Sequence, residues 1–220
     1  MLSGIDSLNN LTSADEEDIE RQIREYFEET DMPQEEVEKR VALGIDLNKV
    51  FRNLFILMAT AEIIEELENK RDTFADYAYS GYIDAMQDNG YDVDPIGTGY
   101  IELYSKNRCK EIVDTAILHK ADSFYGSLEH TILISEDESS AVVNYYDQLS
   151  AISSGMKYKT WITMQDNKVR HSHSVLDGRT IGIYQPFDVG NYQMMFPCDS
   201  SLGASQKEIA NCRCFIEYSK

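Results

Sequence analysis

The stretch LGIDLNKVFRNLFILMATAEII, residues 43–64, carries the clearest periodic pattern of the chain. Its apolar residues alternate spacings of four and three, the heptad repeat of a helix that buries one side. These residues are Leu43, Leu47, Val50, Leu54, Leu57, Ala61 and Ile64. Phe51, Phe55 and Met58 widen the apolar stripe, which favours the central helix of a bundle. Self-association of two copies through residues 43–64 is the alternative.

Helical signals continue upstream and downstream of this tract. Ser13-Ala-Asp-Glu16 fits a capping box and predicts the start of a first helix. Residues 30–33, which end in a proline, are expected to separate that helix from the next. An aromatic-rich helical pattern then ends at Asn89-Gly90, and residues 92–99 have the composition of a loop.

Two further helices are expected in the middle of the chain. In the first, Cys109 shares the spacing of the apolar face, which marks it as a core residue and not a nucleophile. The second is expected to start at Ser135-Glu136 and to end near Gly155, a C-terminal cap residue.

The last seventy residues change from helical to alternating patterns. Residues 157–164 alternate in polarity as a strand does, and Asp166-Asn167 is a turn from which residues 168–170 return. Short strands are also expected at residues 181–184, 192–196 and 212–218. The fold class is therefore α+β, with a helical docking or self-association region over residues 1–99 and a small β-rich C-terminal domain over residues 100–220.

The charge distribution excludes several function classes. The chain has 220 residues and a net charge of −19, with 33 acidic and 12 basic residues in the first 150 but 6 and 8 in the rest. Such an acidic protein is not expected to bind nucleic acid strongly. No apolar stretch is long enough for a membrane span. The first residues lack the features of a signal peptide, so synthesis and folding in a cytoplasm are expected.

Residues able to perform chemistry are concentrated in the last fifty positions. Cys212 and Cys214 would lie on one face of a strand, and with His173 they would provide three ligands of a tetrahedral Zn²⁺. Cys198 or His171 would be the fourth ligand. The alternatives are buried free thiols that hydrogen-bond to His173, and a disulfide, which a cytoplasmic origin disfavours.

Three separated motifs in this region carry a resemblance to a known family. They are residues 159–178 (KTWITMQDNKVRHSHSVLDG), residues 196–199 (FPCD) and residues 208–215 (EIANCRCF). Their order and spacing resemble the phage Mu protein F-like family of minor head proteins, or head morphogenesis proteins, over residues 120–215. The helix that starts at Ser135-Glu136 is similar to the family's helix before the β unit. The residues that carry the resemblance are Lys159, Trp161, Asp166, Arg170, His173, Asp177, Gly178, Asn211, Cys212, Arg213 and Cys214.

The resemblance implies a virion component with a structural role and no catalytic residues. Family members are associated with the portal vertex, assist head assembly, and in some cases travel with the DNA. The expected partners are therefore a phage portal or major capsid protein. The expected location is the capsid interior or portal vertex, after assembly in the host cytoplasm. An acidic helical region would suit docking to a basic surface of such a partner.

Two other functions are compatible with the residues alone. A small nuclease or toxin-like effector would use His173 with Arg170 or Lys168 in acid–base catalysis. An acidic binding module that mimics nucleic acid would instead gather its charge on one exposed face, whereas much of the acidity here flanks apolar helical stripes.

Overall fold

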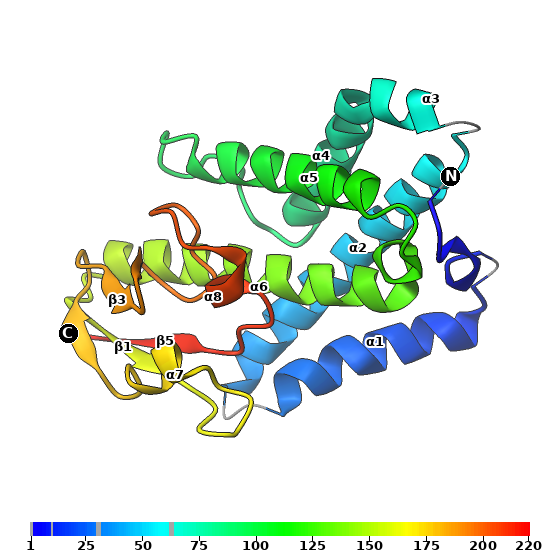
Figure 1. The fold of residues 1–220 in the computed structure, drawn as a ribbon. Coiled ribbons are helices and arrows are strands. Elements are labelled where there is room, and N and C mark those ends of the chain that lie inside the picture. The colour runs from blue at the N-terminus through cyan, green and yellow to red at the C-terminus, as the bar shows by residue number, and fades with distance from the viewer. Residues whose placement is uncertain (1, 10, 30–31, 62–63) are drawn as a thin grey trace. The chain divides into compact units, whose positions relative to one another are not determined.

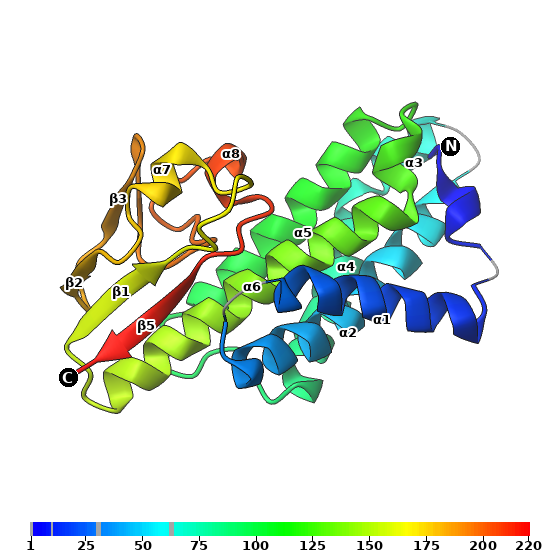
Figure 2. The same ribbon diagram turned by 90° about the horizontal axis from the view of Figure 1, so that it is seen from below.

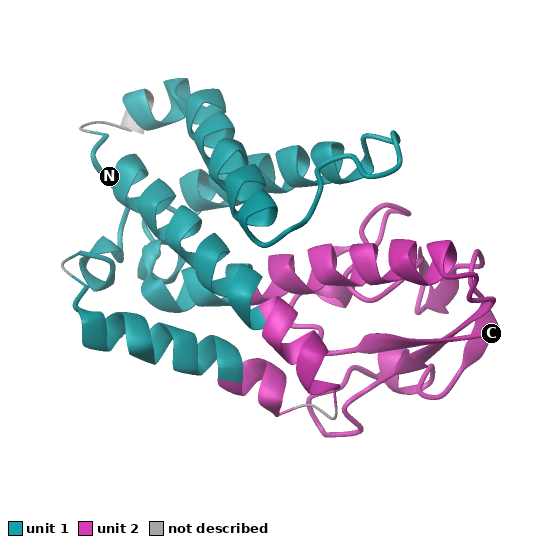
Figure 3. Cartoon of the chain, turned by 180° about the vertical axis from the view of Figure 1, so that it is seen from behind, with its two compact units in different colours: residues 1–24, 41–135 teal, residues 25–40, 136–220 magenta. Residues whose placement is uncertain are grey.

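A computed structural model describes residues 2–9, 11–29, 32–61 and 64–220. The chain forms two compact units: unit 1 comprises residues 1–24 and 41–135, and unit 2 comprises residues 25–40 and 136–220 (Figure 3). The expected boundary after residue 99 falls inside unit 1. The physical reason is the packing of the helix that follows residue 99 against the helix that precedes it, which keeps both in one unit.

The described part of the chain is helical up to residue 153 (Figure 1). Its helices are η1 (Ile5–Ser7), α1 (Ser13–Glu28), α2 (Gln34–Ala59), α3 (Ile64–Asn69), α4 (Arg71–Asp88), α5 (Tyr100–Leu118), η2 (Ser123–Gly126) and α6 (Leu128–Ser153). Unit 1 contains α3, α4 and α5 entirely, while α1, α2 and α6 each contribute residues to both units.

Most of the apolar stripe of α2 is buried inside unit 1 by other helices of the same chain, although Val50 is half-buried and Leu57 is exposed. Phe51 packs edge to face on Tyr82 of α4, and Phe55 stacks on His130 of α6. The burial agrees with the central helix of a bundle. The helix ends at Ala59, so the last two positions of the heptad pattern lie beyond it, and Ile64 starts α3.

Two helix starts differ from the sequence expectation. The first cap is Thr12 and not Ser13: the Thr12 hydroxyl accepts from the amide of Asp15, whose carboxylate accepts from the Thr12 amide. The helix expected to start at Ser135 is the middle of α6, where the buried Ser135 hydroxyl donates to the Ile132 carbonyl. A serine in this role mimics a cap in sequence while it lies inside a helix.

Unit 2 combines a small sheet with loops and short helices (Figure 2). Strand β1 (Tyr158–Ile162) lies between β2 (Thr180–Gly182) and β5 (Phe215–Ser219), antiparallel to both. A separate hairpin pairs β3 (Phe187–Val189) with β4 (Tyr192–Met194). The short helices are α7 (His171–Ser174) and α8 (Gln206–Ile209). The chain is therefore α+β, helical first and with its sheets at the C-terminal end.

The structure corrects two expected strands of unit 2. Residues 168–170 are not a returning strand but lead into α7. Strand β5 begins at Phe215, so Cys212 and Cys214 precede the strand in which they were expected. Among the described helices, none has an apolar run long enough to cross a bilayer.

Candidate metal centre

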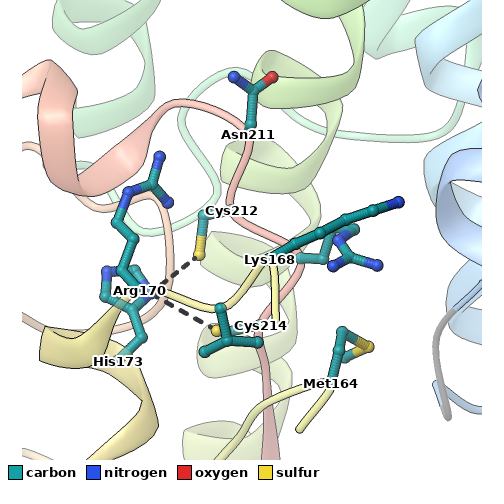
Figure 4. Close-up of a pocket in the computed structure, with 9 residues that line it drawn as sticks. Met164, Lys168, Arg170, His173, Asn211, Cys212 and Cys214 are labelled. Atoms are coloured by element: carbon teal, nitrogen blue, oxygen red, sulfur yellow. Dashed lines mark hydrogen bonds between the residues drawn. The ribbon is translucent and has the colours of Figure 1, made fainter. Parts of the chain in front are cut away.

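Unit 2 brings three metal-binding side chains together in its interior. Nδ1 of His173 lies 3.5 Å from the sulfur of Cys212 and 3.5 Å from the sulfur of Cys214 (Figure 4). The three ligand atoms all lie within 4.8 Å of one another, and all three residues are buried. Residues 39 and 41 positions apart thus meet at one point, which makes this a possible metal-binding triad.

The two equal nitrogen–sulfur distances bear on whether the triad could hold a metal ion. One imidazole nitrogen has a single lone pair or a single N–H, so it makes one directed hydrogen bond and not two. A tetrahedral zinc with Zn–S of about 2.3 Å and Zn–N of about 2.0–2.1 Å separates nitrogen from each sulfur by about 3.5 Å. The geometry therefore fits a shared central ion as well as a hydrogen-bonded thiol.

Local structure positions each member of the triad. His173 belongs to the single turn of α7, which begins after Arg170, and Leu176 donates its amide to the His173 carbonyl. Cys212 and Cys214 lie in the segment between α8 and β5. Both sulfurs face His173, while the side chain of the intervening Arg213 donates to Asp166.

A carboxylate lies on the far side of the imidazole. Nε2 of His173 lies 3.3 Å from the Glu208 carboxylate, which also accepts a hydrogen bond of 2.7 Å from the Ser172 hydroxyl. Histidines that bind metals through one nitrogen commonly donate the other N–H to a carboxylate, which fixes the tautomer. Glu208 is the nearby carboxylate for that task, although Nε2 of His173 forms no hydrogen bond with the described residues in this structure. No sequence spacing had singled out Glu208.

The electrostatics concentrate negative charge on one sulfur. Contacts with the Cys198 and Cys214 thiols, and then with His173, hold the pKa of the Cys212 thiol well below its usual value. The interaction with Cys212, together with burial, raises the pKa of Cys198 and Cys214. Burial opposes protonation of His173, but its contact with Cys212 outweighs this and raises its pKa. Thiolates are the metal-binding form of cysteine.

The indole of Trp161 closes one side of the cluster. Trp161 is fully buried, and its ring packs edge to face on His173 and on Phe187. Its Nε1 has no hydrogen-bond partner within normal distance among the described residues. The indole N–H is nevertheless close enough to Cys214 to act against the rise in the pKa of that thiol. A buried N–H that faces sulfur suits a charged thiolate better than a neutral thiol.

The other motif residues build the loops around the triad. Arg213 donates to Asp166, and Arg170 donates to the Ala210 carbonyl. Asp177 accepts from the amide and the hydroxyl of Thr163, at 2.8 and 2.9 Å. Each of these bonds joins segments distant in sequence, so these side chains fix the loops that carry the ligands.

Three motif positions have other structural tasks. The buried Lys159 donates to Gln148 and to a backbone carbonyl, and burial lowers its pKa to about 8. Gly178 has φ +71, a conformation that side chains disfavour. Asn211 also has a positive φ, of 54, and its backbone amide donates to the Asp137 carboxylate.

The remaining candidates divide between the cluster and the surface. None of the four cysteines, all of them described, is in a disulfide. Cys198 is buried near Cys212, whereas Cys109 lies in the core of unit 1 as expected. His171 is exposed. A small hollow of unit 2 reaches the cluster. It is lined by Met164, Lys168, Val169, Arg170, His173, Asn211, Cys212, Arg213 and Cys214.

Comparison with known proteins adds no relative to this description. The chain matches no protein-family model, no curated protein and no solved structure. The interpretation of the cluster therefore depends on its own geometry and chemistry.

Proposed function

We propose that this chain is a minor head protein of a phage or prophage, and that its unit 2 is organised around a Zn²⁺ bound by His173, Cys212 and Cys214. The role is structural. The chain would assist head assembly in association with a portal or major capsid protein, and its location would be the virion.

One observation supports the proposal: residues of the motifs that resemble the head-protein family hold the loops of unit 2 together. The side chains of Asp166, Arg170, Asp177 and Arg213 bond to partners that hold the loops around the triad. A motif used in this way supports the construction of a rigid domain. Such a domain suits a particle component, which must persist and has no substrate to turn over.

The burial of the imidazole argues against the nuclease alternative. His173 is 1% exposed, and its two nitrogens face the cysteine sulfurs and Glu208. A general base must reach the proton that it removes from the substrate. Arg170, its suggested helper, already donates to a backbone carbonyl.

The virion role is tested on purified particles. Particles from the phage or induced strain that encodes the chain should contain it after density-gradient purification, and mass spectrometry should detect it at a low, fixed ratio to the portal protein. Cross-linking should join it to the portal or major capsid protein. Particles with complete heads that lack the chain, in which the gene is also dispensable for assembly, would refute this role.

The metal is tested on the purified full chain. Elemental analysis should give about one zinc per chain, and the variant with both Cys212→Ser and Cys214→Ser should contain none, while Cys109→Ser keeps the wild-type content. Absence of stoichiometric metal in the wild type, purified without chelator, would refute the zinc site. DNA or RNA cleavage that is lost in His173→Ala would instead favour the nuclease.

A further inference from the structure

The three ligands of the proposed zinc site leave one position of a tetrahedron open, and the inference below rests on that proposed site. Structural zinc sites have four protein ligands, whereas catalytic sites keep one position for water or substrate. The identity of the fourth ligand therefore determines whether the centre is closed or open. Unit 2 offers Cys198, His171 and Glu208 near the triad, and the hollow offers water.

Cys198 lies beside the triad and is enclosed by protein. The residue is 3% exposed, and its sulfur lies 3.7 Å from the Cys212 carbonyl oxygen and 3.8 Å from that of Ile209. The thiol therefore lies against the segment that carries Cys212. Its sulfur is outside the group of atoms that are mutually within 4.8 Å, so rotation about the Cα–Cβ bond would be needed to bring it to a shared ion.

The backbone at Cys198 is held in an unfavourable conformation. Its φ is +67, in the left-handed region that residues other than glycine rarely adopt. The next residue, the buried Asp199, fixes this turn because its carboxylate accepts from the amides of Met195 and Ser201, both at 2.8 Å. Strain of this kind persists only where the surrounding structure holds the backbone in place, and it is concentrated at functional sites such as ligand clamps.

The two other candidate side chains, His171 and Glu208, are not placed to bind the same ion. The side chain of His171 is exposed, whereas that of His173 is buried, two positions along the same turn. Residues two apart in a helix do not face the same side. The Glu208 carboxylate lies on the Nε2 side of His173, opposite the nitrogen that faces the sulfurs, and it also binds Ser172.

A cationic side chain lies beside the cluster. Three thiolates and a neutral histidine give a Zn²⁺ centre a net charge of −1, whereas two thiolates leave it neutral. Arg170 lines the same hollow as His173, Cys212 and Cys214. A guanidinium at this place can offset the charge of a third thiolate.

We propose that Cys198 is the fourth ligand, so that the centre is a closed Cys₃His site. The ion would then join the turn at residue 198, the helix α7 and the segment 212–214. Such a site fixes three segments with little regular secondary structure, and it holds no position for substrate.

The experiment is X-ray absorption spectroscopy at the zinc edge of the full chain. The wild type should give three sulfurs and one nitrogen in the first coordination shell, and Cys198→Ser should give two sulfurs. Cys198→Ser should also lose zinc at a chelator concentration at least tenfold lower than the wild type does. Cys109→Ser removes a buried thiol of unit 1 and should leave both measurements unchanged.

The outcomes separate this inference from the site on which it depends. Two sulfurs in the wild type, unchanged in Cys198→Ser, would overturn the closed site and leave the zinc proposal intact. No bound metal in the wild type would overturn both. The sulfur count of the wild type decides between closed and open sites even where Cys198→Ser fails to fold.

Discussion

Unit 1 and unit 2 bury different kinds of side chain. Of the buried polar or charged residues among those described, five belong to unit 1 and twelve to unit 2. The α2 stripe of unit 1 packs aromatic rings between helices, as Phe51 does on Tyr82. Unit 2 instead buries Lys159, His173 and Arg213 among short strands and loops.

The difference shows how a region with little regular structure can be held together. Apolar burial is non-directional and stabilises any well-packed helix bundle. Buried polar groups stabilise a fold only when each finds its partner, and they then define one arrangement. Asp199 illustrates this in unit 2: it is fully buried, and its two carboxylate oxygens accept from the amides of Met195 and Ser201. The following tests ask whether the two units depend on these different forces.

Removal of metal is expected to have the largest effect, and to act on unit 2. The chain has one tryptophan, Trp161, which packs on His173 and so reports on the proposed centre. A strong zinc chelator should shift its emission to longer wavelength and lower the free energy of unfolding of unit 2 by several kcal/mol, since metal binding contributes directly to folding. Far-ultraviolet circular dichroism should keep most of the helical signal. An unchanged emission spectrum would show that unit 2 does not depend on metal.

Truncation of the α2 stripe should affect unit 1 independently of metal. Phe55 is fully buried and stacks on His130, so Phe55→Ala should cost about 3–5 kcal/mol of unfolding free energy. Urea denaturation followed by circular dichroism measures this loss, with and without chelator. Leu57→Ala on the same helix is the control, since Leu57 is 37% exposed. Equal losses in the two variants would contradict the bundle core.

The pH dependence of unit 2 should include a contribution from a buried carboxyl in α6. Burial, and then the charge of Asp137, raise the pKa of Glu136 to about 8. The folded state then binds a proton that the unfolded state releases above about pH 4.5, so this contribution to stability is complete below that pH and is lost as the pH rises through 8. Glu136→Gln should match the wild type at pH 5 and exceed it by about 1–3 kcal/mol at pH 9.

Thermal unfolding at several pH values tests this expectation. Glu129→Gln, an exposed position in the first turn of the same helix, should show no comparable gain. Parallel pH profiles of Glu136→Gln and the wild type would contradict the assignment.

The smallest expected effect concerns a helix start of unit 1. Thr12→Ala removes the hydroxyl that accepts from the Asp15 amide and should cost about 1 kcal/mol. Ser13→Ala, at the position favoured by the sequence pattern, should cost less. Thermal unfolding of both variants compares the two caps, and a larger loss in Ser13→Ala would restore the original interpretation.

Helices were predictable where apolar spacing alone defines them. Most of the stripe from Leu43 to Met58 and the core position of Cys109 were expected and are buried, but Val50 is half-buried and Leu57 is exposed. The start of α6 was not predictable, because Ser135-Glu136 has the local pattern of a cap although both side chains are buried in mid-helix. Tertiary packing of α6 outweighs that local preference.

The candidate site was predictable in its members and not in its surroundings. Cysteine and histidine are common metal ligands, so His173, Cys212 and Cys214 could be named as candidate ligands from the sequence. Glu208 could not, because a single glutamate carries no such signal until the fold places it beside Nε2 of His173. Residues 168–170 were expected in a strand because no sequence signal indicated that α7 begins at His171.

The sequence by itself determined the helical pattern, the α+β class and the types of residue available for chemistry, because periodicity and side-chain chemistry are local properties. Only the tertiary structure decided that His173 meets two sulfurs some forty positions away, that Glu208 lies 3.3 Å from its other nitrogen and that Cys198 lies beside Cys212. Distances of a few ångströms between remote residues depend on how loops are packed, and no local pattern encodes them.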